Sequence, residues 1–292
     1  MILEQTAARQ TKLLSLLRQE FGLSAGLVKR LKWQNALFVN GAPAHTDAAV
    51  NPGDRVRVVL EERTEGFGPE PLPLSILYED ECFLAVDKPA GMLVHPSPQK
   101  NSGTLANGVL YHLLAHGEAS GVHPVTRLDR DTFGVVILAK NANIHDRFCR
   151  MLRERQLEKT YCASVFGRPP QDEGQIELPV YKVGGGSLIR VVDERGQQAL
   201  THYRVLERAE HTALLELHPL TGRTHQLRLH CMASGFPILG DPQYKSPESA
   251  VYSAAHGLFT QQLCAARLVF SHPMTGEQME ILSKQAVFFP KD

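Results

Sequence analysis

The stretch TRLDRDTFGVVILAK, residues 126–140, joins a highly charged turn to an apolar run. The run is short and rich in β-branched residues, which is typical of a buried strand. Asp129 lies just before it, where polar loop meets protein core, so its carboxylate is expected to be partly desolvated. On these residues alone, the stretch is either a solvated turn with mutually compensating charges or the site of a reactive carboxylate.

The charges of this turn also imitate a phosphatase signature. Asp129 and Asp131 have the spacing of the paired aspartates in the D-x-D-x-T/V pattern of aspartate-nucleophile phosphatases. The fifth position of that pattern is Thr or Val, whereas this chain has Phe133. The motif also lies deep in the chain, and no alternation of strands and helices follows it. A phosphatase or a metal hydrolase is therefore disfavoured.

Strand-like runs dominate the chain from residue 76 onward. These runs are 76–80, 82–88, 134–140, 159–167, 201–207, 213–220, 264–270 and 279–283. The clearest helical patterns in the same region cover 141–156 and 223–235. This order predicts an α+β fold built on a largely antiparallel or mixed sheet with few helices. The glycine run at 183–187 lacks the G-x-G-x-x-G spacing, so we expect a flexible turn there rather than a phosphate cradle.

The first 60 residues have a character of their own. Leucines at helical spacing over 13–21 predict one helix, and Ser24 is the expected N-cap of a second helix over 25–35. An Asn-Gly turn after a short apolar run, and an alternating run over 52–60, predict short strands. We therefore expect a compact α/β module over residues 1–60.

The outer side of the second predicted helix is basic, because Lys29, Arg30 and Lys32 crowd it. Such a face is either ordinary solvated surface or a contact for nucleic acid, and the pattern alone leaves both open. Residues 61–75 are acidic, rich in Gly and Pro and without periodicity, so we expect an extended linker. The main domain is expected to cover 76–292.

The composition restricts the class of protein. The 292 residues suffice for two domains and carry 31 Lys and Arg against 31 Asp and Glu. Because the net charge is zero, any nucleic-acid surface must be a local patch. Five scattered cysteines without a CxxC pair disfavour a disulfide framework and a cysteine-rich zinc site. Without a membrane-length apolar run or a signal-peptide pattern, the chain is expected to be cytoplasmic, and we expect a monomer.

A second polar segment, HPLTGRTHQLRLHCMASGFPILGDPQY, lies towards the C-terminus. Arg223, Gln226 and Arg228 belong to the start of its helical pattern, and a helix N-terminus beside two arginines favours anionic oxygen. His225 and His230 suggest a metal site, but their i, i+5 spacing puts them on different helix faces. We therefore predict no metal.

Four segments, taken in order, resemble the RluA-type family of RNA pseudouridine synthases. The segments are DKPAGMLVHP, TRLDRDTFGVVILAKN, KTYCASVFG and HPLTGRTHQLRLHCMASGFPILGDPQY. The likeness covers residues 76–281. The N-terminal module is similar to the small alpha-L RNA-binding domain first seen in a ribosomal small-subunit protein. The resemblance implies a pseudouridine-synthase catalytic domain over 76–292 that follows an alpha-L domain over 1–60 and a linker.

The family pattern around the catalytic aspartate is written HRLDxxTSG. The residues of this chain that match it are Arg127, Leu128, Asp129, Thr132 and Gly134. Thr126 stands where His is usual, and Phe133 stands where a small residue is usual. These two departures concern packing around the site, the geometry of the loop and the choice of RNA.

The resemblance also implies roles for single residues. Asp129 is expected to be the catalytic carboxylate, either as nucleophile at C1′ or as base at C2′. Tyr161 matches the active-site tyrosine, whose ring stacks on uracil and whose hydroxyl accepts or relays the C5 proton. Arg223 matches the arginine that pairs with the carboxylate, and Arg127 is expected to fill the space of a flipped-out uridine. The other expected RNA contacts are Lys29, Arg30, Lys32, Gln226 and Arg228.

The implied reaction isomerises uridine to pseudouridine within RNA. The N1–C1′ bond breaks, the uracil turns and C5 bonds to C1′, so no cofactor, metal or redox step is expected. Large-subunit ribosomal RNA is the expected substrate, and transfer RNA remains an alternative. A non-catalytic RNA-binding protein that keeps the fold is a further alternative, since Thr126 and Phe133 depart from the family pattern.

Overall fold

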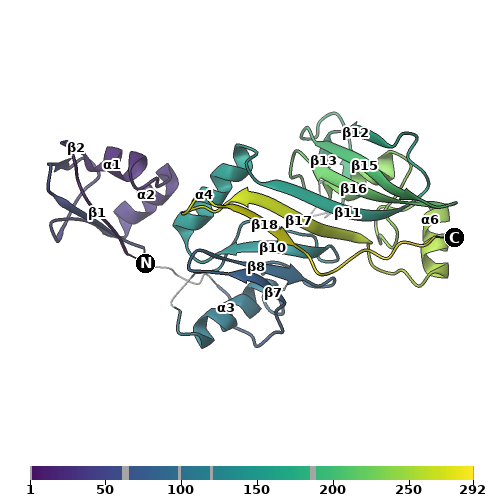
Figure 1. The fold of residues 1–292 in the computed structure, drawn as a ribbon, viewed down its shortest axis with the longest axis horizontal. Helices are drawn as coiled ribbons and strands as arrows, with labels where there is room; N and C mark the ends of the chain where they lie inside the picture. Colours follow the sequence, from purple (N-terminus) through teal and green to yellow (C-terminus); the bar gives the residue numbers. More distant parts are fainter. Residues whose placement is uncertain (1, 61–65, 98–99, 119–120, 185–188, 292) are drawn as a thin grey trace.

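The computed structural model describes residues 2–60, 66–97, 100–118, 121–184 and 189–291. A ten-stranded sheet forms the main body of the molecule (Figure 1). Its central path consists of β12 (Glu173–Glu177), β15 (Leu200–Arg208), β16 (Thr212–Pro219), β11 (Glu158–Phe166), β17 (Leu263–Ser271), β10 (Phe133–Ala139), β8 (Phe83–Lys88) and β7 (Ile76–Glu79). β18 (Gln278–Leu282) pairs with β17, and β9 (His123–Pro124) pairs with β10. β10 and β17 run parallel, whereas the other pairs of this sheet are antiparallel. The predicted α+β fold with a largely antiparallel, mixed sheet is confirmed.

The apolar run after Asp129 becomes β10 because helices cover both faces of the sheet at this point (Figure 1). Val135 and Ile137 pack on the side of α4 (Ala142–Arg153), and Val136 and Leu138 pack on the side of α3 (Leu105–Ala115). A strand that is buried on both faces has no polar side, so its sequence is a continuous apolar run rather than an alternating one.

Two helices of the main domain were not expected from the sequence. α3 begins with a capping box between Thr104 and Asn107, and α6 (Pro247–Ala255) begins with one between Ser246 and Ser249. The N3 residue of each box, three positions after the N-cap, is Asn or Ser rather than the usual Glu or Gln. α3 is also largely apolar around its circumference, so it shows no clear amphipathic period.

Near the predicted helix at 223–235, the structure has a shorter helix, α5 (Gln226–Ala233). A small hairpin of β13 (Val180–Lys182) and β14 (Arg190–Val192) flanks the glycine run. The flexible turn expected at 183–187 falls mostly on residues 185–188, which lie outside the described part of the chain. The described residues contain no helix that is long and apolar enough to cross a membrane.

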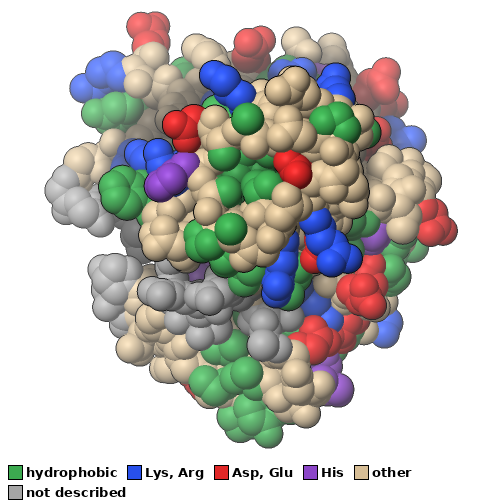
Figure 2. All heavy atoms as spheres, turned by 90° about the vertical axis from the view of Figure 1, so that its left-hand side faces the viewer, with side chains coloured by type: hydrophobic (Ala, Val, Ile, Leu, Met, Phe, Trp, Pro, Cys, Tyr) green, Lys and Arg blue, Asp and Glu red, His purple; other side chains and the backbone are tan. Residues whose placement is uncertain are grey.

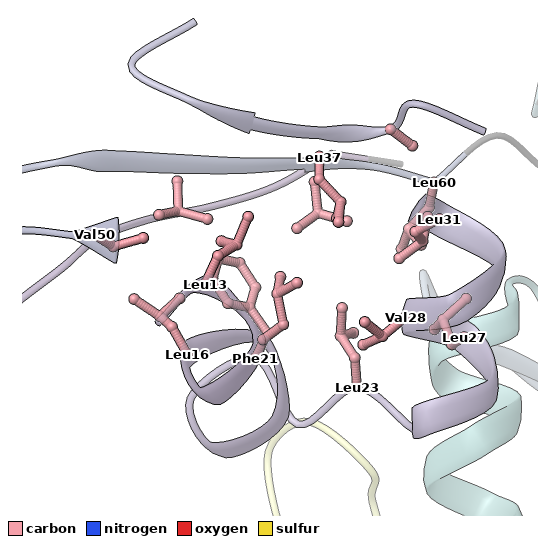
Figure 3. Packing of buried hydrophobic residues seen from close by; sticks show 14 of the residues in the cluster. Leu13, Leu16, Phe21, Leu23, Leu27, Val28, Leu31, Leu37, Val50 and Leu60 are labelled. Carbon is pink, nitrogen blue, oxygen red and sulfur yellow. The ribbon is translucent and has the colours of Figure 1, made fainter. Parts of the chain in front are cut away.

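The N-terminal residues form a small sheet with its own core (Figure 3). Its strands, in order, are β1 (Ile2–Thr6), β6 (Arg55–Val59), β3 (Leu37–Val39) and β4 (Ala42–Pro43), and a second pair is β2 (Thr11–Lys12) with β5 (Ala49–Val50). α1 (Leu13–Gln19) and α2 (Ala25–Trp33) pack on this sheet. Ser24 caps α2 as expected, since its Oγ accepts a hydrogen bond from the Leu27 amide. Asn40 and Gly41 both have positive φ, which suits the tight turn between β3 and β4.

The N-terminal module contacts α4 of the main domain. The Ser24 hydroxyl donates to Asp146, and Arg150 Nη2 donates to the Gly22 carbonyl at 3.1 Å. Arg147 reaches both the Phe21 carbonyl and the Pro273 carbonyl. The described part of the predicted linker, 66–75, contains no helix or strand and lies along α3, where the carboxylate of Glu70 accepts from the Gly103 amide. Residues 61–65 lie outside the described part of the chain.

Candidate functional site

Three strands bring the charged turn and the strand tyrosine together at one point of the sheet. Ala265 of β17 is the register partner of Gly134 in β10 on one side and of Tyr161 in β11 on the other. Gly134 has a φ of 109°, and a Cβ at this position would lie 2.3 Å from the Ala265 carbonyl oxygen. Only glycine fits here, and this close approach fixes where the turn that carries Asp129 leaves the sheet.

Two of the four charged residues of the turn, Arg130 and Asp131, pair with each other. Arg130 Nη2 lies 2.9 Å from Asp131 Oδ2, and the Thr132 amide closes the turn on the Asp129 carbonyl. Beneath the turn, buried Lys88 donates to the carbonyls of Pro89, Met92 and Arg130. Burial lowers the pKa of Lys88 to about 8, an effect that the charges of Asp131 and Asp129 oppose. Asp131 therefore has a structural partner, whereas Asp129 faces elsewhere.

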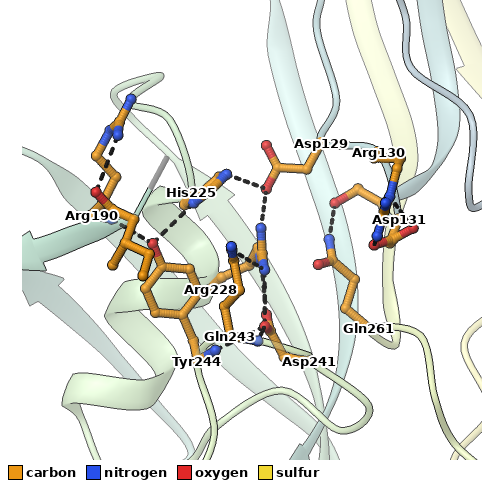
Figure 4. A network of polar contacts seen from close by, with 12 residues as sticks. Asp129, Arg130, Asp131, Arg190, His225, Arg228, Asp241, Gln243, Tyr244 and Gln261 are labelled. Atoms are coloured by element: carbon orange, nitrogen blue, oxygen red, sulfur yellow. Dashed lines mark hydrogen bonds and ion pairs between the residues drawn. The ribbon is translucent and has the colours of Figure 1, made fainter. Parts of the chain in front are cut away.

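The carboxylate of Asp129 pairs with Arg228 of α5. Arg228 Nη1 lies 2.9 Å from Asp129 Oδ2, and the Asp129 side chain is 25 % exposed. Figure 4 shows Arg228 between Asp129 and Asp241, with His225 and Tyr244 on one side and the Arg130–Asp131 pair on the other. The site thus offers a half-buried carboxylate with one oxygen held by a guanidinium and the other open to a ligand.

Arg228 is itself rigidly held. Its Nε and Nη2 donate to the two oxygens of fully buried Asp241 at 2.6 and 2.9 Å, and Nη2 also donates to Gln243. Its guanidinium carbon lies 5.0 Å from the centre of the Tyr244 ring. Burial alone lowers the pKa of Arg228, but hydrogen bonds and charge from Asp241, and also Asp129, raise it above its ordinary value. Arg228 is therefore a fixed cation that orients Asp129.

The sequence prediction chose the wrong arginine for this pair. Arg223 was expected to pair with Asp129, but its Nε donates to the Gln198 carbonyl at 3.2 Å and its side chain is exposed. The reason is local: His225 has a φ of 58°, so the chain turns there and α5 begins only at Gln226. Arg223 therefore precedes the helix, whereas Arg228 lies within it, on the face towards Asp129.

Gln226 and Arg228, which were predicted to contact RNA, are both buried in the structure. Gln226 is 3 % exposed, and its amide donates to Leu200 and Thr201 while its oxygen accepts from Thr221 and the Arg223 amide. It ties the start of α5 to β15. Arg228 is 4 % exposed and bonded as described above. Arg127, Lys29, Arg30 and Lys32 are exposed, as an RNA contact requires.

His225 is a second group beside Asp129, and Tyr244 holds its ring in place. The Arg190 amide donates to the Tyr244 hydroxyl oxygen, and that hydroxyl is hydrogen-bonded to His225 Nδ1 at 2.9 Å. Burial lowers the pKa of His225, with the charge of Asp129 opposing the shift, so the ring is neutral at pH 7. His225 Nε2 lies 3.9 Å from Asp129 Oδ2.

Tyr161 contributes an aromatic ring to the same site. It packs at the junction of two core clusters, against residues such as Ala265 and Leu217. Burial raises the pKa of Tyr161, and the negative charge of Asp129 adds to the shift, so the hydroxyl stays protonated at neutral pH.

The two departures from the family pattern fill core positions. Thr126 is buried, and its hydroxyl accepts a hydrogen bond from the Ile137 amide at 3.0 Å. Phe133 is buried at the start of β10, where its register partner is Cys264. Both side chains support β10 and leave the Asp129–Arg228 pair intact.

Among the described residues, one group with the donor atoms of a metal site, Asp80, Cys82 and His272, lies elsewhere. Asp80 already accepts from two backbone amides, from the Tyr78 hydroxyl and from His272. His272 Nδ1 accepts from the backbone amides of Met274 and Thr275. Burial raises the pKa of the Cys82 thiol to about 11, so it is protonated at neutral pH. These donors are engaged within the protein and do not fit a metal site.

Sequence reasoning missed the residues that hold Arg228, namely Asp241, Gln243 and Tyr244. All three come from the short segment GDPQY, which follows the apolar run FPIL. The available signal was Asp241, an acidic residue directly after a buried run. A charge in such a place needs a partner of opposite charge, and so does Arg228 on the nearby helix. Without the tertiary structure, nothing indicated that the two segments meet.

Comparison with known proteins gives the class to which this fold belongs, the RNA pseudouridine synthases. A family model described as RNA pseudouridylate synthase matches residues 82–233. The chain belongs to this family and is an RNA pseudouridine synthase, which confirms the RluA-type resemblance.

Two curated relatives illustrate the likeness. The uncharacterized RNA pseudouridine synthase YlyB of Bacillus subtilis (strain 168) is 37% identical over 84% of this chain and 80% of its own length. The ribosomal large subunit pseudouridine synthase D of Nitrosomonas europaea is 35% identical over 84% of this chain and 72% of its own length. Among solved structures, human RNA pseudouridylate synthase domain containing 1 superposes with a TM-score of 0.61 at 26% identity, covering 75% of this chain and 86% of that chain.

Proposed function

We propose that the enzyme isomerises a uridine in large-subunit ribosomal RNA and that Asp129 is its catalytic carboxylate. The ion pair between Asp129 and buried Arg228 is the observation that carries this assignment. Arg228 stabilises the anionic form of the carboxylate and fixes its direction, while the outer oxygen stays open to the ribose. The names of relatives such as the ribosomal large subunit pseudouridine synthase D support the choice of RNA.

In the proposed reaction the target uridine first leaves its base stack, which costs a few kcal/mol unless it is already unpaired. Asp129 then attacks C1′ or removes the C2′ proton, and the N1–C1′ bond breaks. The uracil turns on the face of Tyr161 and C5 bonds to C1′, which breaks the bond from Asp129 to C1′ in the first case or is accompanied by return of the proton to C2′ in the second. The C5 proton then leaves. Arg127 is exposed at the start of the charged turn, where it can occupy the place of the flipped nucleotide.

The activity is tested with purified protein and large-subunit ribosomal RNA transcripts that carry tritium at C5 of uridine. The proposed reaction releases this tritium to water, because C5 loses its hydrogen when it bonds to C1′. Transfer RNA transcripts serve as the second substrate class. Release from the ribosomal transcripts supports the proposal, and release from transfer RNA alone contradicts the choice of RNA.

Tyr161→Phe tests the proposed role of the tyrosine hydroxyl. The variant keeps the ring on which uracil stacks, but it cannot pass on the C5 proton, so tritium release should slow by about 10²-fold or more at unchanged RNA affinity. Because the pKa of Tyr161 is raised, the wild-type rate should show no loss from ionisation of this hydroxyl up to about pH 10. Wild-type rates in Tyr161→Phe would show that the ring alone is used.

We also propose that the N-terminal module binds RNA through the outer face of α2. Lys29, Arg30 and Lys32 are exposed there, and neighbouring Trp33 is 79% exposed, which offers a ring for an unpaired base. Figure 2 views the molecule from the side of this module, and acidic side chains are interspersed with basic ones on it. The contact is therefore expected to be local rather than a broad basic surface.

Replacing Lys29, Arg30 and Lys32 with Ala should weaken RNA binding and flatten its salt dependence. Each lost phosphate contact reduces the slope of log K against log [salt] by about 0.7–0.9, so the triple variant should lose about 2. The matched control is Arg55→Ala with Arg57→Ala on strand β6 of the same module, which should change the slope by less. Equal slopes for the triple variant and the wild type would contradict binding by this face.

A further inference from the structure

Lys159 of β11 differs from the other partly or fully buried lysines near the centre of the sheet. Lys88 donates to three carbonyls, and Lys140 is paired with Glu79 and Glu118. The Lys159 side chain is half-buried, yet its ammonium group makes no hydrogen bond or ion pair with any residue in the described ranges. Burial lowers the pKa of Lys159, and no carboxylate opposes the shift.

A partly buried ammonium group without a partner is unfavourable for the folded protein. A charged group that loses water without gaining a partner destabilises the native state. Groups of this kind are found at functional sites, where a ligand supplies the missing partner. A charge that destabilises the free protein is retained there because it binds the ligand. An anionic ligand is the partner that an ammonium group lacks.

The surroundings of Lys159 provide further donors for an anion. Its Nζ lies 3.8 Å from the position that a Cβ on Gly222 would take, so the open side of this glycine faces the ammonium. The Gly222 amide has no partner in the described part of the chain, and neighbouring Arg223 is exposed with only its Nε engaged, at the Gln198 carbonyl. The ammonium of Lys159 thus lies beside a loop that also carries an unpaired backbone N–H and an exposed guanidinium.

The loop is also close to the proposed reaction site. Lys159 precedes Tyr161 by two residues in β11, which is about 7 Å along the strand. Gly222 and Arg223 lead directly into His225 and α5, the elements that border Asp129. A phosphate bound at this loop would therefore belong to a nucleotide next to the one that reacts.

We propose that Lys159, the Gly222 amide and Arg223 form a binding site for a backbone phosphate of the substrate RNA, beside the target uridine. The proposal deepens the proposed function and rests on it for the identity of the ligand. In this site Arg223 contacts the RNA strand rather than Asp129. The phosphate supplies the counter-charge that Lys159 lacks in the free protein, and it sets the position of the strand across Tyr161.

The test compares wild type, Lys159→Gln and Lys159→Arg in binding to a ribosomal RNA stem-loop that the wild type modifies, between about 50 and 300 mM KCl. Lys159→Gln should bind more weakly, and its slope of log K against log [salt] should be smaller by about 0.7–0.9, whereas Lys159→Arg should restore the slope. Arg223→Gln should show the same loss. The control Lys291→Gln, which removes a surface lysine paired with Glu207, should leave the slope unchanged.

Two further readouts separate this site from other roles. With a phosphate contact, Lys159→Gln raises KM at a nearly unchanged kcat, and its melting temperature equals or exceeds that of the wild type, because an unpaired charge has been removed. A lower kcat with an unchanged salt slope would place Lys159 at the uracil and overturn the proposal. A lower melting temperature with an unchanged slope would give Lys159 a structural role and also overturn it. Absence of tritium release by the wild type would instead contradict the proposed function, whatever the salt slopes.

Discussion

Asp129→Asn is expected to lower the rate of pseudouridine formation by about 10³-fold or more, with little change in RNA affinity or folding. Asn has the shape of Asp, and its oxygen still accepts a hydrogen bond from Arg228 Nη1. It has no negative charge, so it neither attacks C1′ nor removes a proton from C2′. Single-turnover tritium release at saturating enzyme measures this step directly.

The turn itself supplies the matched control for Asp129→Asn. Asp131 is two residues away and also acidic, but it is paired with the exposed Arg130. Asp131→Asn should therefore react within a few fold of the wild type. If Asp131→Asn lost activity and Asp129→Asn kept it, the assignment of the catalytic carboxylate would have to be reversed.

Arg228→Met is expected to have the second largest effect, because it reduces both stability and activity. Removing one member of a buried ion pair leaves the other charge uncompensated, and here Asp241 has no exposed surface. The expected loss is about 3–5 kcal/mol in the free energy of unfolding. Arg228→Lys keeps the charge but cannot donate to Asp241, Gln243 and Asp129 together, so it should recover only part of the loss.

Urea denaturation of both Arg228 variants, together with tritium release below their unfolding midpoints, checks this expectation. Arg223→Met is the control from the same segment, and because Arg223 is exposed its stability should stay within about 0.5 kcal/mol of the wild type. The roles given to the two arginines would be contradicted if Arg223→Met destabilised the protein and Arg228→Met did not.

The strands of the sheet could be predicted from the sequence because most of them are short apolar or alternating runs. The run from Val135 to Ala139, for example, is buried in the structure as a continuous strand between two helices. α3 was not recognised because its apolar residues surround the helix, so no amphipathic period distinguishes it from a loop or a strand. The missed elements are those whose pattern depends on what covers them.

The candidate site was predictable in its residues but not in its contacts. Asp129 and Tyr161 were identified by motif, and the register at Ala265 brings their segments together. The choice between Arg223 and Arg228 depended on where α5 begins, and this is set by the left-handed backbone at His225. That conformation depends on tertiary contacts, such as the hydrogen bond between His225 and Tyr244, which residue spacing does not encode.

Pseudouridine mapping of large-subunit ribosomal RNA tests the central claim most directly. The RNA would come from cells of the source organism that lack this gene and that carry either the wild-type chain or Asp129→Asn. We predict that at least one pseudouridine is absent without the gene, returns with the wild type and stays absent with Asp129→Asn. The account would be contradicted if no pseudouridine in this RNA depended on the gene, or if Asp129→Asn restored the modification as well as the wild type does.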